Sequence, residues 1–141
     1  MYTSFAPRPI ISVIAIAMLA AEIVIHAVLA PDHLEEVPYI GVGFVVSSVL
    51  LTGVALVLVV SAGNRWAWLA GAALCGGMGV LFAISRLVGL PDYHEGWSSD
   101  AGLGFWSLPP ELIFLACAAA ARTSVGRHPS SRGPMGAPAT V

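Results

Sequence analysis

The sequence predicts an all-α membrane protein: a bundle of four transmembrane helices arranged as two helical hairpins, with both termini in the cytoplasm. Apolar residues make up 57% of the chain and charged residues 10%, against about 45–50% and about 25% in soluble domains. A soluble chain of this length could not bury so much apolar surface. Because about 20 residues cross a bilayer, four apolar runs can supply the spans: residues 10–30, 39–61, 66–90 and 107–123.

The first run, residues 10–30, is similar to a secretory signal peptide in having a single arginine, Arg8, before it. However, Glu22 and His26 interrupt its apolar core, and Pro31 follows the apparent cleavage site. The run is also long enough to span a membrane. We therefore expect a retained helix that ends near residue 30, with the proline in the loop behind it.

The second and third runs are predicted to be joined by a tight turn at residues 62–65, where glycine and asparagine allow the chain to reverse. The second run holds no charged residue.

Cys75 and Cys117 lie in the third and fourth runs, so we expect packed thiols rather than a disulfide. Small residues recur every four positions along the third run, which is typical of a face for close helix contact: Gly71, Cys75, Gly79 and Ala83.

The fourth helix is expected to begin at Ser107 as its N-cap, because Pro109 and Pro110 lack donors that a first turn does not need. With its end near residue 123, this helix is short for a bilayer of about 30 Å. Either residues 103–106 extend it, or it packs with a tilt. Residues 124–141 are rich in Gly, Pro and Ser, and this composition predicts a flexible cytoplasmic tail.

The arginines predict the orientation in the membrane, because cytoplasmic loops are enriched in basic residues. The chain has no lysine, and the two loops on the far side of a four-span bundle hold acidic residues but no arginine. The arginines on the near side, which we assign to the cytoplasm, are Arg8, Arg65, Arg122, Arg127 and Arg132.

Arg86 is the exception, since it lies in the apolar end of the third run. An arginine at this depth usually pairs with a carboxylate or reaches the interface. We expect it to pair with Glu111, in the first turn of the fourth helix, where the helix dipole favours a negative charge. A contact with an anion or another ligand is the alternative.

Glu22 lies near mid-membrane, about 13 Å below the outer end of its helix at about 1.5 Å per residue. His26 follows one turn later on the same face. A charge at this depth costs at least about 2.5–3.5 kcal/mol, so Glu22 should face the bundle and have a partner, or be protonated. The pair predicts a proton relay, part of a metal site, or a buried hydrogen-bonded pair that fixes helix packing.

Each of the two outer loops carries Pro-Asp followed shortly by His and Glu. Imidazole and carboxylate groups suit divalent metals such as Zn²⁺ or Fe²⁺, whereas a solvated acidic turn is the alternative. The hypothetical metal ligands are His33, Glu36, His94 and Glu95.

Several function classes find no support in the sequence. It contains no nucleophile elbow, no phosphate-binding glycine loop and no paired-cysteine motif. It has no basic cluster suited to nucleic acid. Among the histidines, only His26 lies inside a predicted helix, whereas a haem held in the bundle would need two histidine ligands inside helices. We therefore do not expect an enzyme, a haem protein or a nucleic-acid-binding protein.

Three segments carry a resemblance to a known group: His33-Leu34-Glu35-Glu36 after the first run, Ser85 to Pro91 after the third, and Glu111 opening the fourth helix. Over roughly residues 20–115 the chain resembles a group of uncharacterised small four-helix integral membrane proteins of actinobacteria. The group has no established activity, so the resemblance implies only that the outer-face cluster matters.

Together these features predict a non-catalytic accessory subunit or binding protein of the cell membrane, with a site on its extracytoplasmic face. The expected partners are the lipid bilayer and other membrane protein subunits, or further copies of this chain. The alternative is a small oligomeric carrier coupled to protons or metal through Glu22 and His26. The predicted ligand or partner residues are Glu22, His26, Asp32, Glu35, Arg86, Asp92 and Glu111.

Overall fold

The structure, a computed structural model, describes residues 7–93 and 103–123. Every helix in this part is long and apolar enough to cross a membrane. The prediction of an all-α chain with four helices able to span is therefore confirmed for the described residues. The predicted tail, 124–141, lies outside them. The helices are α1 (Pro9–Glu36), α2 (Pro38–Val60), α3 (Arg65–Leu87) and α4 (Leu103–Thr123).

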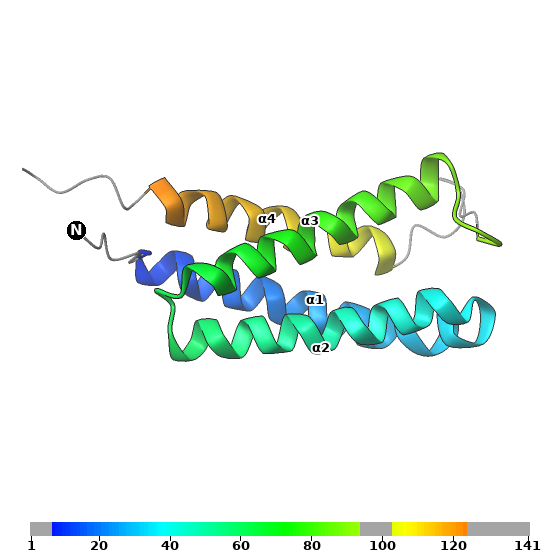
Figure 1. The fold of residues 1–141 in the computed structure, drawn as a ribbon, viewed down its shortest axis with the longest axis horizontal. Coiled ribbons are helices and arrows are strands. Elements are labelled where there is room, and N and C mark those ends of the chain that lie inside the picture. Colours follow the sequence, from blue (N-terminus) through cyan, green and yellow to red (C-terminus); the bar gives the residue numbers. More distant parts are fainter. Residues whose placement is uncertain (1–6, 94–102, 124–141) are drawn as a thin grey trace, which may run out of the picture.

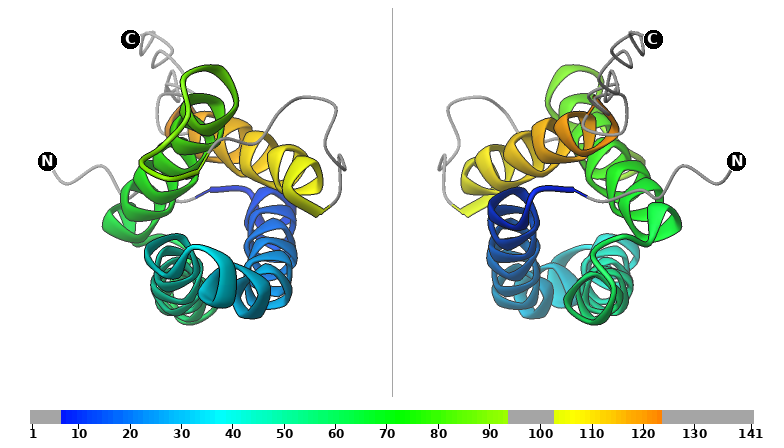
Figure 2. Two further views of the ribbon diagram at one scale, coloured as in Figure 1. Left: turned by 90° about the vertical axis from the view of Figure 1, so that its right-hand side faces the viewer. Right: turned by 90° about the vertical axis from the view of Figure 1, so that its left-hand side faces the viewer.

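The helices run in alternating directions along the long axis of the molecule (Figure 1). Viewed down that axis they form a ring in which α1 packs against α2 and α4, and α3 packs against the same two helices (Figure 2). The start of α1, the α2–α3 turn and the end of α4 therefore share one end of the bundle. The α1–α2 turn and the end of α3 share the other end, which we call the α1–α2 end.

The inside of the bundle is apolar but small. Leu19, Leu51 and Phe114 are fully buried, and Trp68 stacks on Phe114 with ring centroids 5.8 Å apart. Most of the remaining large apolar side chains point outward; Val49, for example, is 66% exposed. A soluble monomer rarely exposes apolar surface so widely, whereas a bilayer solvates it, so the outer surface is suited to lipid.

Helix α1 continues well past residue 30, where we had expected it to end. Pro31 lies inside the helix, which ends only at Glu36, before an extended Val37 (φ −140°, ψ 82°) and Pro38. A proline removes one backbone donor from a helix, and the neighbouring turns tolerate that loss here. As a result, His33 lies two turns above His26 on the same side of α1.

Two other boundaries also differ from the sequence-based expectation. Helix α3 ends at Leu87 rather than near residue 90. Helix α4 begins at Leu103, so the first of the two alternatives for this helix is correct and its 21 residues span about 31 Å. The hydroxyl of Ser107 donates to the carbonyl oxygen of Gly104 at 2.9 Å within the helix, and Ser107 is therefore not the N-cap.

The turn between α2 and α3 has the predicted chemistry. The side chain of Asn64 accepts hydrogen bonds from the backbone N–H groups of Trp66 (3.0 Å) and Ala67 (3.3 Å). It thereby satisfies two donors that the first turn of a helix leaves unpaired. Asn64 is thus the N-cap of α3.

The predicted small-residue face of α3 is confirmed as a surface of close contact. A Cβ added at Gly71 would lie 2.5 Å from the ring of Phe114, and one at Gly79 would lie 3.0 Å from a carboxylate oxygen of Glu111. Cys75, between them, is buried, and both cysteines are free thiols. The absence of larger side chains lets α4 bring Glu111 into the bundle.

Candidate functional site

Buried polar side chains gather towards the α1–α2 end of the bundle. Glu22 and His26 come from α1, Arg86 from the last turn of α3, and Glu111 from α4; each is at most 4% exposed. In an apolar medium such groups are costly unless they are paired or hydrogen-bonded. This part of the molecule is therefore the strongest candidate for a functional site.

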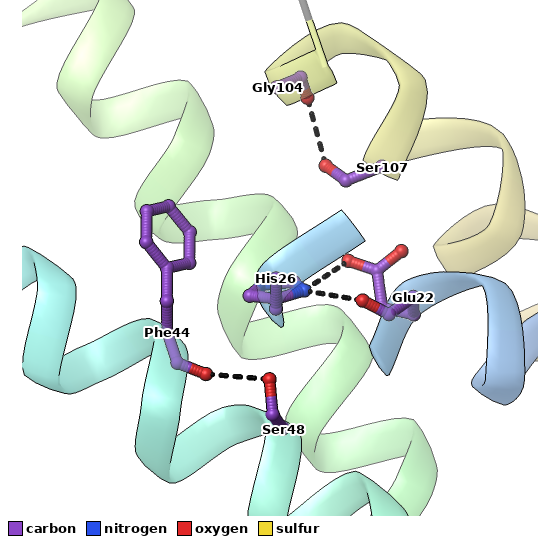
Figure 3. Close-up of polar contacts among 6 residues, drawn as sticks. All are labelled: Glu22, His26, Phe44, Ser48, Gly104 and Ser107. Atoms are coloured by element: carbon purple, nitrogen blue, oxygen red, sulfur yellow. Dashed lines mark hydrogen bonds and ion pairs between the residues drawn. The ribbon is translucent and has the colours of Figure 1, made fainter. Parts of the chain in front are cut away.

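Glu22 and His26 lie in contact on one face of α1, as their spacing predicts (Figure 3). The imidazole Nδ1 lies 3.0 Å from the carboxylate Oε1 of Glu22 and 3.0 Å from its backbone carbonyl oxygen. The Nδ1–H is directed at the carbonyl, so neither carboxylate oxygen of Glu22 receives a well-aligned donor. With its proton on Nδ1, a neutral His26 carries a lone pair on Nε2.

Glu111 enters the bundle from α4, which packs against α1, the helix that carries Glu22. Both side chains are buried, 3% and 1% exposed respectively. The sequence placed both residues in the site but did not show that their helices are neighbours in the ring.

The expected pairing of Arg86 with Glu111 is not found: no ion pair joins these two side chains, both of which the structure describes. The Arg86 guanidinium lies instead over two aromatic rings, 5.2 Å from the centroid of Phe82 and 5.4 Å from that of Phe105. Cation–π contacts of this kind stabilise a buried arginine. The start of α4 at Leu103 explains the difference, because it brings Phe105 beside Arg86.

His33 links α1 to the turn that follows α3. Its Nδ1 donates to the carbonyl oxygen of Leu29 at 2.9 Å, and its Nε2 lies 3.3 Å from the hydroxyl of Tyr93. This hydroxyl can donate to Nε2, because Nδ1 carries the ring proton. Tyr39 of α2 donates to the carbonyl oxygen of Pro91 in the same turn at 2.5 Å. Two tyrosines therefore hold the turn over the α1–α2 end.

The same turn contains two residues with positive φ, Gly89 (88°) and Asp92 (56°). Glycine adopts this conformation freely and aspartate tolerates it. Leu90 and Tyr93 pair through two backbone hydrogen bonds, at 2.6 and 2.9 Å. The reversal directs both Leu90 and Tyr93 towards the helices.

Phe44 of α2 fills the space between the two imidazoles. Its ring centroid lies 5.0 Å from that of His26 and 4.9 Å from that of His33, in edge-to-face arrangements. Its carbonyl oxygen accepts a hydrogen bond from the hydroxyl of Ser48 (Figure 3). Phe44 thus separates the deeper histidine from the one near the end of the bundle.

These residues surround a cavity of about 320 Å³ between the helices. All four helices contribute to its wall, and the turn after α3 contributes Leu90 and Tyr93. The wall is mostly apolar and aromatic with a few polar groups, as is typical of small-ligand sites. The polar and aromatic residues that line it are His26, His33, Tyr39, Phe44, Ser47, Phe82, Ser85, Tyr93, Ser107 and Glu111.

The acidic residues near the end of α1 do not join this cavity. Asp32, Glu35 and Glu36 are exposed, as is Asp92. No group of three or more His, Cys, Asp or Glu side chains is placed to hold a metal ion within residues 7–93 and 103–123. The other two hypothetical metal ligands, His94 and Glu95, lie outside the described residues, so the metal hypothesis stays a prediction.

Several cavity residues were not predicted, notably Phe44, Ser47 and Ser85. Gly43 and Ser47 are four residues apart on α2 and therefore share one face of that helix. The second apolar run thus did contain one face with small, less apolar residues. Nothing in the sequence shows which face of α2 points inward, however, because the whole helix is apolar. Tyr93 lies in a loop after Pro91, where no helical periodicity of the sequence could indicate that it faces the cavity.

The chain matches no protein-family model, no curated protein and no solved structure. The function is therefore argued from the cavity and its polar groups.

Proposed function

We propose that this chain is a multi-pass membrane protein that binds a small ligand in the cavity between its four helices. The observation that carries the proposal is the cavity itself, a space of about 320 Å³ with aromatic walls and a buried carboxyl, Glu111, at its lining. Cavities of this size accommodate small organic molecules, and a few polar groups in an apolar wall fix their orientation. The proposal concerns binding rather than catalysis.

The orientation in the membrane is part of the proposal. The two helical hairpins would place both termini in the cytoplasm, because Arg8, Arg65 and Arg122 belong to the bundle end at which α1 begins and α4 ends. The cavity would then lie towards the extracytoplasmic side. A role as an accessory subunit is compatible with this arrangement, since a ligand-binding bundle can work within a larger complex.

The cavity-filling variant Ser47→Trp tests the proposal. The purified protein is heated in a non-ionic detergent with a panel of small aromatic compounds that are cationic, neutral or anionic, and the midpoint of thermal unfolding is measured. We expect some compounds to raise the midpoint of the wild type, since a ligand that binds only the folded state stabilises it. The Ser47→Trp variant should show no such shift.

Val49→Trp is the matched control, because Val49 lies on the same helix and is 66% exposed on the outer surface. This variant should respond to compounds as the wild type does. Compounds that stabilise wild type and Ser47→Trp equally would bind elsewhere. That result, or a panel without any stabilising compound, would contradict the proposal.

A further inference from the structure

The cavity has a side opening between α2 and α3. Among the described residues that line it, those that are exposed all come from these two helices: Tyr39, Gly43 and Leu81. Leu81 is 55% exposed, and a Cβ added at Gly43 would meet no atom within 4 Å. The lining residues that α1 and α4 contribute are buried or half-buried. The cavity is therefore closed towards α1 and α4 and open between α2 and α3.

The course of the two helices explains this opening. They are joined by the short turn at residues 61–64 and diverge from there towards the α1–α2 end (Figure 1 and Figure 2). Near that end, the hydroxyl of Tyr39 reaches across to the carbonyl oxygen of Pro91 and bounds the opening. Tyr39 is the second residue of α2, and Gly43 lies about 6 Å further along the helix. In the orientation proposed above, the opening lies in the extracytoplasmic half of the bilayer.

The surface around the opening is apolar. Val46, one turn along α2 from Gly43, is 49% exposed, and Ile84, one turn along α3 from Leu81, is 37% exposed. Helix α2 holds no charged residue, and Arg86, the charged residue of α3 at this end, is 3% exposed. A lipophilic molecule can pass such a rim directly from the bilayer, whereas an ion would have to give up its hydration at a high cost.

The buried ionisable groups do not require a charged ligand. Arg86 is protonated at any ordinary pH and supplies one positive charge. Glu22 and Glu111 supply up to two negative charges, and His26 supplies up to one positive charge. This set has a net charge of zero without a ligand when one carboxyl is protonated and His26 is uncharged. An uncharged ligand leaves that balance unchanged.

Two polar groups in the cavity are available to a ligand. The hydroxyls of Ser85 and Ser107 donate to carbonyl oxygens of their own helices at 2.8 and 2.9 Å, whereas the Ser47 hydroxyl makes no hydrogen bond to any described residue. The Nδ1 of His26 donates to the carbonyl oxygen of Glu22. In the uncharged ring Nε2 is then an acceptor, and it too makes no hydrogen bond within the described part of the chain. A hydroxyl group suits both, because it can donate to the imidazole and accept from the serine.

We propose that the cavity takes an uncharged lipophilic molecule with a hydroxyl group, such as a phenol, and that this ligand enters from the bilayer between α2 and α3. The body of the ligand packs against the apolar and aromatic wall, and its hydroxyl binds at His26 and Ser47. This inference rests on the proposed function, and it adds the chemical class of the ligand and the route by which it enters.

The test of the ligand class uses 2-naphthol and its methyl ether, 2-methoxynaphthalene, which cannot donate a hydrogen bond. Full-length protein in lipid nanodiscs is mixed with each compound at neutral pH, at which a phenol is uncharged. Energy transfer from the tryptophans of the protein gives the affinity and the association rate, after the signal from protein-free nanodiscs is subtracted. We expect 2-naphthol to bind, and the ether to bind at least about tenfold more weakly, because the acceptor in the cavity is left unpaired.

Gly43→Phe tests the route, because the added ring occupies the opening. We expect association of 2-naphthol with this variant to be slower by at least about tenfold. Gly53→Phe is the matched control: Gly53 lies on the same helix, is exposed and also has open space around it, and this variant should bind as the wild type does. If Gly43→Phe does not fold, Gly43→Leu replaces it. Association with the Gly43 variant that is as fast as with Gly53→Phe would overturn entry between α2 and α3.

Equal affinities for 2-naphthol and its methyl ether would overturn the assignment of a hydroxyl ligand. Failure of 2-naphthol to bind, while charged compounds of the thermal panel stabilise the protein, would overturn the assignment of an uncharged ligand. Both results would leave the proposed function standing. Binding of neither naphthalene compound, together with an unresponsive thermal panel, would overturn the inference and the proposed function alike.

Discussion

Three side chains at the centre of the bundle determine what the site can do. Glu22, His26 and Glu111 are each at most 4% exposed, and the Nδ1 of His26 lies 3.0 Å from a carboxylate oxygen of Glu22. Buried polar groups are costly in an apolar medium unless they are paired or hydrogen-bonded. These three groups therefore set the polar character of the inner part of the site.

The sequence indicated the contact between Glu22 and His26 but not the surroundings of Glu111. Glu22 and His26 are four residues apart on one helix, and this spacing alone predicts their contact. Glu111 lies far from Glu22 in the chain, and its partner depends on which helices are neighbours in the ring. Its predicted pairing with Arg86 rested on its place in the first turn of the fourth helix, where the helix dipole favours a negative charge. The structure instead packs the helix of Glu111 against α1 and places Arg86 over Phe82 and Phe105.

Replacing His26 should weaken the folded protein. In the His26→Leu variant, the buried carboxylate of Glu22 would lose the polar imidazole that lies 3.0 Å from it, and the backbone carbonyl of Glu22 would lose a hydrogen bond. We expect a loss of about 1–3 kcal/mol in unfolding free energy, the cost of leaving a buried polar group unsatisfied. His33→Leu is the control: His33 is only half-buried, and its loss should cost about 1 kcal/mol or less.

Unfolding of both variants by dodecyl sulfate in mixed micelles, followed by circular dichroism, measures this difference. Equal stabilities for the two variants would show that His26 does not compensate Glu22.

At the scale of the helices, the spans were predictable but their ends were not. Long apolar runs identify helices regardless of partners, and all four spans were found. Two of the three helix ends that differ from the prediction concern prolines. Pro31 continues α1, and Pro109 and Pro110 lie inside α4. A proline disfavours helix continuation locally, but packing against neighbouring helices decides the outcome, and the local sequence does not show that packing.

Helix α2 approaches α1 closely at one glycine, and this gives a sharp test of the packing. A Cβ at Gly41 would lie 2.4 Å from the backbone nitrogen of Leu34, so Gly41→Ala must push the two helices apart. We expect it to lower the unfolding free energy by about 1–3 kcal/mol. Gly53, on the same helix, has open space around it, and Gly53→Ala should be neutral or stabilise by about 0.5–1 kcal/mol.

The same unfolding measurement applies to both glycine variants. A Gly41→Ala protein as stable as Gly53→Ala would contradict the close contact between α1 and α2.

At the scale of the whole molecule, the two ends of the bundle differ in chemistry. The end at which α1 begins and α4 ends carries Arg8, Arg65 and Arg122, whereas the other end carries the exposed acids after Pro31 and the cavity. Charge patterning in the sequence was enough to predict this asymmetry. The cavity was not predictable, because its wall depends on which apolar residues face inward from helices that are apolar all round.

The reactivity of a cysteine in the cavity, measured from outside intact cells, tests the central claim of a ligand cavity near the extracytoplasmic side. In a background with Cys75→Ala and Cys117→Ala, the Ser47→Cys variant is treated with the membrane-impermeant reagent 2-(trimethylammonium)ethyl methanethiosulfonate. Glu36→Cys and Gly63→Cys, both at exposed positions, report the two bundle ends, and Val49→Cys reports the outer surface. We predict that Ser47→Cys is labelled in intact cells, more slowly than Glu36→Cys, and that a compound which raises the unfolding midpoint of the wild type protects it. The account would be contradicted if Ser47→Cys were labelled only after the cells are permeabilised, as expected for Gly63→Cys. Labelling of Ser47→Cys that is no faster than labelling of Val49→Cys would also contradict it.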